Sequence, residues 1–253
     1  MPKINVVICS KNRPRELKRC LYFLKQQAYK DFDYVVIDLD ISLVQCRQLG
    51  VDNTKGEIVV FIDDDVEMGH MWLWNIIAEF NKDSNIVGVT GPTIVPEVWQ
   101  MNRDIFKYFS IYKFFNKSER PGYFSKWGVP SMYSNFKRDY YGKVSYLECC
   151  NMALRRDIIN RVGGFDLNYE KTSEWSEVDL AMRCSLYGKL IFSPRCALEH
   201  YPSKAGVYKD RLDTSHRYRN YIRFSDKHLK PCWQLTVYKL LYGGYLWLKE
   251  KVK

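Results

Sequence analysis

The chain has 253 residues, of which 46% are hydrophobic and 27% are charged, a composition that is ordinary for a soluble globular protein. This length suits one large domain or two small ones. None of its eight cysteines belongs to a CxxC pair, which argues against a zinc knuckle. The formal net charge of +10 fits nucleic acid, an anionic membrane surface or a phosphorylated substrate as a partner, or simply a solvated basic surface.

The first hundred residues alternate between strand and helix patterns. The β-branched run 4–9 predicts a buried strand, and Pro14 suits the first position of a helix with apolar residues at helical spacing. Further segments are predicted as strands at 34–37, 58–62 and 86–90, and as helices at 43–53 and 72–80. This alternation indicates an α/β fold with a Rossmann-like, mostly parallel sheet and helices on both faces.

The pattern becomes irregular after residue 98. Residues 99–146 contain fifteen aromatic side chains, interleaved with basic ones. We predict a helix over Met152–Val162, stopped by the two glycines that follow it, and another helix over Glu174–Tyr187. Residues 233–248 form a largely apolar, aromatic segment near the C-terminus.

The run Asp63-Asp64-Asp65 directly follows the third predicted strand. Three consecutive carboxylates repel one another, so they need a divalent cation or solvent to neutralise them. Oxygen ligands of this kind suit Mg²⁺ or Mn²⁺, which keep positions open for phosphate oxygens. The ends of parallel strands are also where ligands bind in such sheets. A solvated acidic turn is the alternative.

A second acidic group, with Glu177 in it, opens the predicted helix over Glu174–Tyr187. A carboxylate at such a helix start can act as a general base when it reaches a hydroxyl in a crevice. The same residues could merely complement the helix dipole, and this segment alone favours that simpler interpretation.

Together these segments resemble the family 2 glycosyltransferases of the GT-A fold. The resemblance rests on the order and spacing of five pieces: Val6–Pro14, Tyr34–Asp38, Gly56–Asp65, Cys150–Asp166 and Glu177–Arg183. It implies a nucleotide-sugar-dependent enzyme that transfers a sugar to a hydroxyl of a glycan or lipid-linked acceptor, with inversion. Departures from the family pattern at Leu39, Gln48 and Cys150 leave the identity of the donor open.

The resemblance also implies roles for particular residues. As residues that bind the nucleotide sugar it implies Arg13, Asp38, Asp63 and Asp64. As metal ligands for Mn²⁺ or Mg²⁺ it implies Asp65 and the later strand-end residue His200, for which a partly buried structural histidine is an equal alternative. Glu177 matches the catalytic base, where the family usually has Asp. Arg217 and Arg219 could cover the diphosphate or form a solvated helix face.

The expected division of the chain has three parts. Residues 1–98 would form the nucleotide-sugar-binding half of the catalytic domain, 99–200 the acceptor-binding and catalytic half, and 201–253 a basic, aromatic extension. Two rival functions are a sugar nucleotidyltransferase and a nucleic-acid-binding protein. The first normally has a glycine-rich phosphate loop, and Ser10–Arg13 contains no glycine. We expect no nucleic-acid partner, because the acidic run would repel phosphate unless metal is bound.

The chain opens without a secretory signal pattern, so we expect a cytoplasmic protein with reduced thiols. The two stretches 99–146 and 201–253 carry nine and twelve basic residues against three and four acidic ones. Peripheral contact with the cytoplasmic face of a membrane is one interpretation. The alternative is that residues 233–248 pack on the catalytic domain and the aromatics of 99–146 stack on acceptor sugars.

Overall fold

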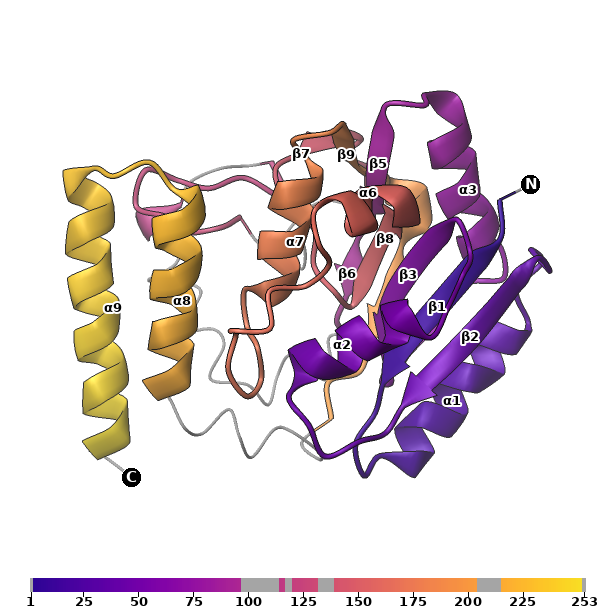
Figure 1. Ribbon diagram of the computed structural model, residues 1–253, viewed down its shortest axis with the longest axis horizontal. Helices are drawn as coiled ribbons and strands as arrows, with labels where there is room; N and C mark the ends of the chain where they lie inside the picture. Colours follow the sequence, from indigo (N-terminus) through magenta and orange to yellow (C-terminus); the bar gives the residue numbers. More distant parts are fainter. Residues whose placement is uncertain (1, 97–113, 117–119, 132–138, 204–214, 252–253) are drawn as a thin grey trace.

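The computed structural model describes residues 2–96, 114–116, 120–131, 139–203 and 215–251 (Figure 1). Its centre is a seven-stranded sheet with the order β2-β1-β3-β8-β5-β9-β7. The strands are β1 (Ile4–Cys9), β2 (Phe32–Ile37), β3 (Ile58–Asp63), β5 (Ile86–Thr90), β7 (Gly142–Val144), β8 (Asn151–Arg155) and β9 (Lys189–Phe192). The β1–β2, β1–β3 and β5–β9 pairs are parallel, whereas β8 and β7 run antiparallel to their neighbours. The predicted α/β fold with a mostly parallel sheet is confirmed.

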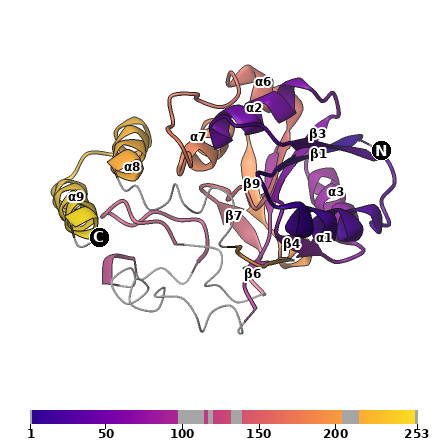
Figure 2. The ribbon, with the colours of Figure 1, turned by 90° about the horizontal axis from the view of Figure 1, so that it is seen from below.

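Helices cover both faces of this sheet (Figure 2). One face carries α2 (Leu43–Asp52), α6 (Arg156–Arg161) and α7 (Ser176–Cys184), and the other carries α1 (Pro14–Lys25) and α3 (Trp72–Lys82). Successive side chains of a strand point to opposite faces. Val7 of β1 therefore lies in the core cluster under α2, while Val6 and Ile8 lie in the cluster under α1 and α3. The β-branched run thus fills two cores from one strand.

One predicted helix is wrong. Residues 151–155 form the antiparallel strand β8 between β3 and β5, and helix begins only at Arg156. A short apolar run such as Met152-Ala153-Leu154 has no period long enough to separate a buried strand from a buried helix. Met152 and Leu154 pack in one core cluster and Ala153 in the other, which is the alternation of a strand. As a result, the segments before and after residue 98 share one sheet.

A second, three-stranded sheet lies beside the end of β3. It has the order β4-β10-β6, with β4 (Val66–Met68), β6 (Thr93–Ile94) and β10 (Leu198–His200), which follows the 3₁₀ turn η2 (Pro194–Cys196). In the antiparallel pair β10–β4, His200 lies opposite Val66. This register brings His200 to the turn formed by Asp63, Asp64 and Asp65.

The remaining two helices stand side by side at the end of the molecule away from β2 (Figure 1). They are α8 (Ser215–His228) and α9 (Trp233–Lys251), and α9 contains the predicted apolar segment 233–248. Phe224 of α8 is fully buried and stacks on Trp175, with 4.9 Å between ring centroids. No helix in the described part of the chain is long and apolar enough to cross a membrane.

Five of the aromatic residues predicted for sugar stacking or membrane contact, Trp99, Phe106, Tyr108, Phe109 and Tyr112, lie outside the described residues. Three of the described ones, Phe115, Phe124 and Trp127, contact the C-terminal helices. Phe115 contacts Trp127, Trp127 contacts Trp233, and Phe124 contacts Phe224, with centroid distances of 5.2, 5.5 and 5.3 Å. These contacts attach the irregular segment to α8 and α9.

Candidate active site

The negative charge of the turn after β3 is partly balanced by Arg13, which precedes α1. Asp64 has no exposed surface, and one of its carboxylate oxygens accepts a 2.6 Å hydrogen bond from the Ser10 hydroxyl. Nη1 of Arg13 lies 3.1 Å from Asp64 and 2.7 Å from Asp65. Burial raises the pKa of Asp64 to about 7, as expected for a carboxylate removed from water. Arg13 and Ser10 therefore make three consecutive aspartates compatible with a folded turn.

Asp63, Asp65 and His200 converge beside this turn. Their ligand atoms all lie within 4.8 Å of one another. Nε2 of His200 is 3.0 Å from Oδ1 of Asp65 and 3.8 Å from Oδ2 of Asp63. Two carboxylates and one imidazole form a donor set that fits a divalent metal such as Mn²⁺. Among the described residues, this is the one group of three or more such side chains close enough to share a metal ion.

The charge of Asp65 is fixed by its neighbours. Burial alone would raise the pKa of Asp65, but the hydrogen bond and charge of His200, together with the charge of Arg13, lower it to about 2. The backbone N–H of Ser203 also donates to Oδ2 of Asp65, at 3.0 Å. Asp65 is therefore ionised at neutral pH, the form that a metal ligand needs.

Glu177 lies in the first turn of α7 and keeps about a fifth of its side chain exposed (21%). Oε2 of Glu177 lies 3.2 Å from Nη1 of Arg47 in α2 and accepts a 3.3 Å hydrogen bond from Ser176. Arg47 itself is buried, with 7% of its surface exposed. The carboxylate is thus held in one orientation by two neighbours while part of it stays accessible.

The loop before α7 has a strained backbone. Lys171, Ser173 and Trp175 have φ angles of 49°, 54° and 78°, in the left-handed region that side chains other than glycine seldom adopt. The Ser173 hydroxyl accepts a 3.1 Å hydrogen bond from the backbone of Val44, and Trp175 stacks on Phe224. Such strain concentrates at functional sites, where the surrounding packing maintains it.

Glu174 in this loop joins α8 to the site. It lies 3.1 Å from Nε of Arg217 and accepts a 2.5 Å hydrogen bond from the Thr172 hydroxyl. Burial alone would raise the pKa of Glu174, but its hydrogen bond with His216 and the charge of Arg217 lower it to about 2. Glu174 therefore holds Arg217 as an ion pair at neutral pH.

These groups border one pocket of about 370 Å³ at the carboxyl ends of the strands, within the range of about 300–1,000 Å³ usual for ligand sites. Its charged lining consists of four cations and four carboxylates: Lys11, Arg13, Arg47, Arg217, Asp63, Glu148, Glu174 and Glu177. Tyr242 of α9 completes one wall. The pocket thus combines the edge of the proposed metal group, a carboxylate and several cations.

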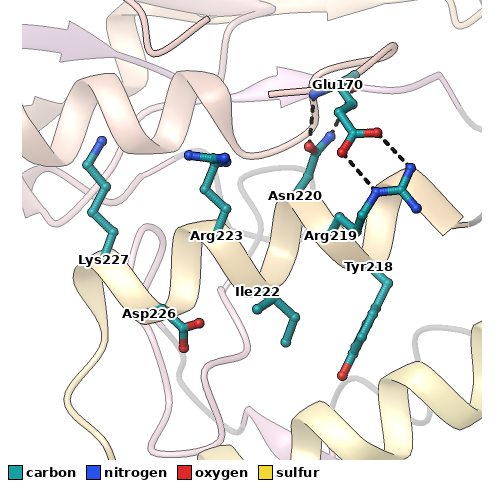
Figure 3. Close-up of a pocket in the computed structure, with 8 residues that line it drawn as sticks. All are labelled: Glu170, Tyr218, Arg219, Asn220, Ile222, Arg223, Asp226 and Lys227. Carbon is teal, nitrogen blue, oxygen red and sulfur yellow. Dashed lines mark hydrogen bonds and ion pairs between the residues drawn. The ribbon is translucent and has the colours of Figure 1, made fainter. Parts of the chain in front are cut away.

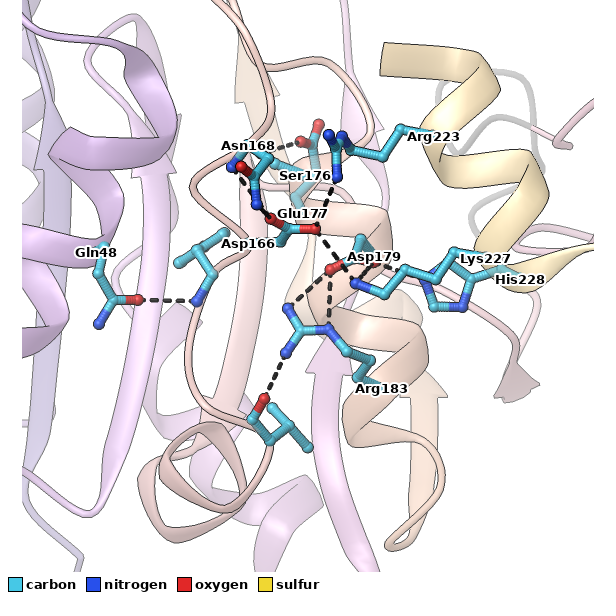
Figure 4. Close-up of polar contacts among 12 residues, drawn as sticks. Gln48, Asp166, Asn168, Ser176, Glu177, Asp179, Arg183, Arg223, Lys227 and His228 are labelled. Atoms are coloured by element: carbon cyan, nitrogen blue, oxygen red, sulfur yellow. Dashed lines mark hydrogen bonds and ion pairs between the residues drawn. The ribbon is translucent and has the colours of Figure 1, made fainter. Parts of the chain in front are cut away.

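Behind the pocket, Asp179 fastens α7 to α8 (Figure 4). The Asp179 carboxylate is fully buried and lies 2.7 Å from both Nζ of Lys227 and Nε2 of His228. It also accepts a 2.9 Å hydrogen bond from Arg183, which donates at 2.7 Å to the carbonyl of Val162. Because Asp179 lies two residues after Glu177, this cluster fixes the helix that carries Glu177.

A second, open groove runs along α8 (Figure 3). Three of its lining cations face carboxylates: Arg219 pairs with Glu170 at 2.6 Å, Arg223 lies 3.7 Å from Asp166, and Lys227 contacts Asp179. The cations that line this groove are therefore paired with carboxylates.

Residues 43–163 match the model of a protein family described as glycosyl transferase family 2. This match marks residues 43–163 as a family 2 glycosyltransferase domain. None of the curated protein sequences compared with it matches.

Three solved structures with similar folds identify the fold of this chain. GalNAc-T7 with UDP, GalNAc and Mn²⁺ matches with a TM-score of 0.63 at 14% identity, over 89% of this chain and 48% of its own. The mannosyltransferase PcManGT from Pyrobaculum calidifontis, in complex with GDP-Man and Mn²⁺, matches with a TM-score of 0.58 at 13% identity, over 97% and 70%. TarS of S. aureus gives 0.57 at 12%, over 98% and 49%. At these identities the likeness shows the fold, which is the GT-A fold predicted from the sequence.

This chain spans about half the length of GalNAc-T7 and of TarS as solved. The matched part nevertheless covers 89%, 97% and 98% of the present chain in the three comparisons.

The glycosyltransferase domain brings most of the predicted site residues together. Arg13, Asp63 and Glu177 line the pocket, and Asp65 and His200 lie beside Asp63.

Two predicted residues lie elsewhere. Asp64 points inward to Ser10, and Asp38 is exposed at the end of β2, where Leu39 and Ile41 line the pocket instead.

Sequence reasoning missed Glu148 and Tyr242 as pocket residues. For Tyr242 the sequence did contain a signal. Tyr238 and Tyr242 are four residues apart, a spacing that places both rings on one face of a helix. Their rings stack with centroids 5.9 Å apart. For Glu148 no signal existed, since the chain around it has no regular period.

Proposed function

We propose that this domain transfers a sugar from a nucleotide-sugar donor to a hydroxyl of a glycan or lipid-linked acceptor, with inversion. One observation carries the proposal. The group Asp63, Asp65 and His200, whose donor atoms fit a divalent metal, adjoins the pocket into which Glu177 presents a partly exposed carboxylate. A sugar transfer needs both functions, one at the leaving diphosphate and one at the attacking hydroxyl.

The donor side would consist of the strand ends in residues 1–98, joined by His200 at the end of β10. Asp63, Asp65 and His200 would hold Mn²⁺ or Mg²⁺, which neutralises the charge that develops on a leaving diphosphate. Arg13 lines the same pocket and adds a fixed positive charge. Asp64 acts through Ser10 and Arg13, which it holds in place.

Two further features bear on the donor. Asp38, exposed at the rim, would contact the base or ribose. The Mn²⁺ complexes of GalNAc-T7 with UDP and of PcManGT with GDP-Man support a nucleoside diphosphate sugar as the donor here.

The acceptor side consists of residues 99–200. Glu177 would take the proton from the acceptor hydroxyl as the new carbon–oxygen bond forms. Arg47 and Ser176 keep its carboxylate oriented before the acceptor arrives. A base on the face of the sugar opposite the diphosphate gives in-line displacement and therefore inversion, through an oxocarbenium-like state.

The test is a thermal-shift screen of the full chain against UDP, GDP, dTDP and CMP, each with and without Mn²⁺. A nucleotide present at 100 times its dissociation constant should stabilise the protein by about 2.7 kcal/mol. The matching nucleotide sugars are then incubated with the protein, and release of the nucleoside diphosphate is followed by mass spectrometry. If no nucleotide raises the melting temperature in the presence of Mn²⁺, the proposal is wrong.

We also propose that the domain contacts an anionic membrane surface on the cytoplasmic side through the basic extension 201–253. One face of α9 exposes seven large apolar side chains: Trp233, Val237, Leu240, Leu241, Tyr245, Trp247 and Leu248. Leu240 and Trp247 are 70% and 56% exposed, and Lys251 lies 4.5 Å from the centre of the Trp247 ring. Aromatic and apolar side chains flanked by lysine suit the membrane interface, and a lipid-linked acceptor would be found there.

A further inference from the structure

Two cysteines of the pocket belong to elements that pack unusually closely. Helix α2 lies against β1, where a Cβ added to Gly50 would come within 2.2 Å of Cγ1 of Val7. Val7 and Cys9 share one side of β1, because side chains alternate along a strand. Cys46 and Gly50 share one face of α2, because residues four apart on a helix do so. Gly50 of α2 packs on Val7 of β1. One helical turn earlier, Cys46 faces Cys9, the next residue on the same side of β1.

The two thiols contact each other and the pocket. The hydrogen bond with Cys9 lowers the pKa of Cys46 to about 7. Both side chains line the nucleotide-sugar pocket, with Cys9 half-buried and Cys46 5% exposed. Both are reduced in the structure. A small reagent that enters the pocket therefore meets the Cys46 thiol, which is partly ionised near neutral pH. The hydrogen bond with Cys46 and burial raise the pKa of Cys9, which stays a thiol beside it.

The other cysteines differ. Cys20, Cys184 and Cys196 are fully buried away from the pocket, and burial raises the pKa of all three thiols. Cys149 and Cys150 also line the pocket, but burial raises the pKa of both thiols. Cys232 is half-buried, and its Sγ lies 3.2 Å from the carbonyl of Lys126. The first attack on a reagent should therefore come from Cys46, and Cys9 is the thiol beside it.

We propose that Cys9 and Cys46 are a modification site at which a peroxide oxidises the two thiols to a disulfide, and that this bond weakens binding of the nucleotide donor. The second half rests on the proposed function of the pocket. The Cys46 thiolate attacks one peroxide oxygen, the O–O bond breaks, and Cys46 becomes a sulfenic acid. The Cys9 sulfur then attacks the Cys46 sulfur, and the S–O bond breaks. Two thiols lose two electrons and two protons, and the peroxide is reduced to two waters.

The bond would disturb donor binding through the residues next to the two cysteines. Ser10 follows Cys9 and holds Asp64, and Arg47 follows Cys46 and holds Glu177. Drawing the end of β1 and the start of α2 together displaces both of these contacts. It also fills the wall of the pocket with the two bonded sulfur atoms.

The experiment treats the reduced full-length protein with hydrogen peroxide, blocks remaining thiols, and maps tryptic peptides without reduction. Cys9 lies in the peptide 4–11, Cys46 in 31–47, and Cys149 and Cys150 together in 144–155. We expect the first two peptides to be joined. In parallel, the affinity for UDP or GDP with Mn²⁺ should fall by at least about tenfold and recover after dithiothreitol.

Three serine variants test whether the cross-link and the loss of nucleotide affinity come from Cys9 and Cys46. Cys9→Ser and Cys46→Ser should each form no such cross-link and show no peroxide-dependent change in nucleotide affinity, whereas Cys232→Ser should respond like the natural chain. The proposal is overturned if 4–11 and 31–47 are not joined, or if they are joined and the affinity is unchanged. Reduced protein that binds no nucleotide would contradict the proposed function, and the effect on donor affinity with it. The peptide map would still decide whether the bond forms.

Discussion

Arg13 is the residue on which the charge balance of the β3–β4 turn depends. One of its nitrogens contacts both Asp64 and Asp65, so two of three adjacent carboxylates share one cation. Asp65 then turns its other oxygen toward His200 and Asp63. Asp64 therefore has a structural role, whereas Asp63 and Asp65 form the candidate metal site with His200.

Asp65→Asn should remove metal-dependent nucleotide binding. An amide has no charge to offer a cation, and it also weakens the contact with Arg13. We expect the affinity for UDP or GDP in the presence of Mn²⁺ to fall by at least about tenfold in isothermal titration calorimetry. Asp83→Asn is the matched control, because Asp83 pairs with Lys189 at the opposite end of the strands. Unchanged Mn²⁺-dependent affinity in a folded Asp65 variant would exclude it as a ligand.

Glu177→Gln should separate chemistry from binding. Glutamine keeps the size of the side chain but cannot take a proton, so transfer should fall by about 10²-fold or more. Donor affinity should stay close to that of the natural chain, because Glu177 lies on the acceptor side. Turnover measurements report the transfer rate, and calorimetry reports the donor affinity. Glu170→Gln, on an exposed carboxylate paired with Arg219, serves as the control.

Wild-type turnover in the Glu177 variant would move the base elsewhere. Asp179 is then a poor candidate, since it is fully buried among Arg183, Lys227 and His228. Glu174, which lines the pocket, would be next.

Among the elements, α7 and α8 act as one unit because of Asp179. Burial alone would raise the pKa of Asp179, but its bonds to His228, Lys227 and Arg183 lower it from 3.8 to about 2. A carboxylate with a lowered pKa stabilises the fold above its unfolded pKa, and this contribution is lost as the pH falls through the folded one. The relevant window is therefore about pH 4 to pH 2.

Asp179→Asn should destabilise the protein at pH 5 by on the order of 2 kcal/mol, because Arg183, Lys227 and His228 then lose a charged partner. The difference in free energy of unfolding between the natural chain and the variant should shrink as the pH falls from 4 toward 2. Urea denaturation at pH 5 and pH 3 measures it. Asp31→Asn, at an exposed aspartate, provides the control. A difference that is constant with pH would mean that the carboxylate charge does not hold α7 to α8.

The sequence predicts most elements of the first ninety residues because each is long and bounded by clear signals, such as Pro14 at the start of α1. It fails at β8, where three apolar residues fit strand and helix equally. The inward orientation of Asp64, in contrast to Asp65 beside the metal group, could not be predicted either, because the resemblance gave Asp64 a role in binding the nucleotide sugar. That difference comes from Ser10 and Arg13, which only the folded sheet brings alongside.

The late helices show another limit of the sequence. An apolar segment at 233–248 is visible, but its division into two faces is not, because apolar residues occur all around the helix. In the structure Leu235 and Leu246 are buried, whereas Leu240 and Trp247 are exposed. Tertiary contacts with α8 make this division, so the exposed face of α9 could be recognised only from the folded chain.

For the molecule as a whole, basic residues and exposed apolar side chains both occur in the extension 201–253. Residues 201–253 carry twelve basic against four acidic residues, and α9 lies at the end of the molecule away from β2 (Figure 1). A contiguous apolar face on a soluble domain commonly marks an interaction site. Since the pocket wall includes Tyr242 of the same helix, a membrane bound along the opposite face of α9 would lie close to the acceptor side.

The double variant Leu240→Asn with Trp247→Ser should therefore reduce binding to anionic vesicles without unfolding the domain, because both side chains are largely exposed. Full-length protein is sedimented with vesicles of phosphatidylcholine alone or with phosphatidylserine added, at low salt. We expect the natural chain to sediment with the anionic vesicles and the variant to bind at least about tenfold more weakly. Leu186→Asn, which alters an 80% exposed leucine outside the helical pair α8–α9, should bind like the natural chain. If the natural chain stays in the supernatant with anionic vesicles at low salt, α9 does not bind membranes, and the transferase proposal is unaffected.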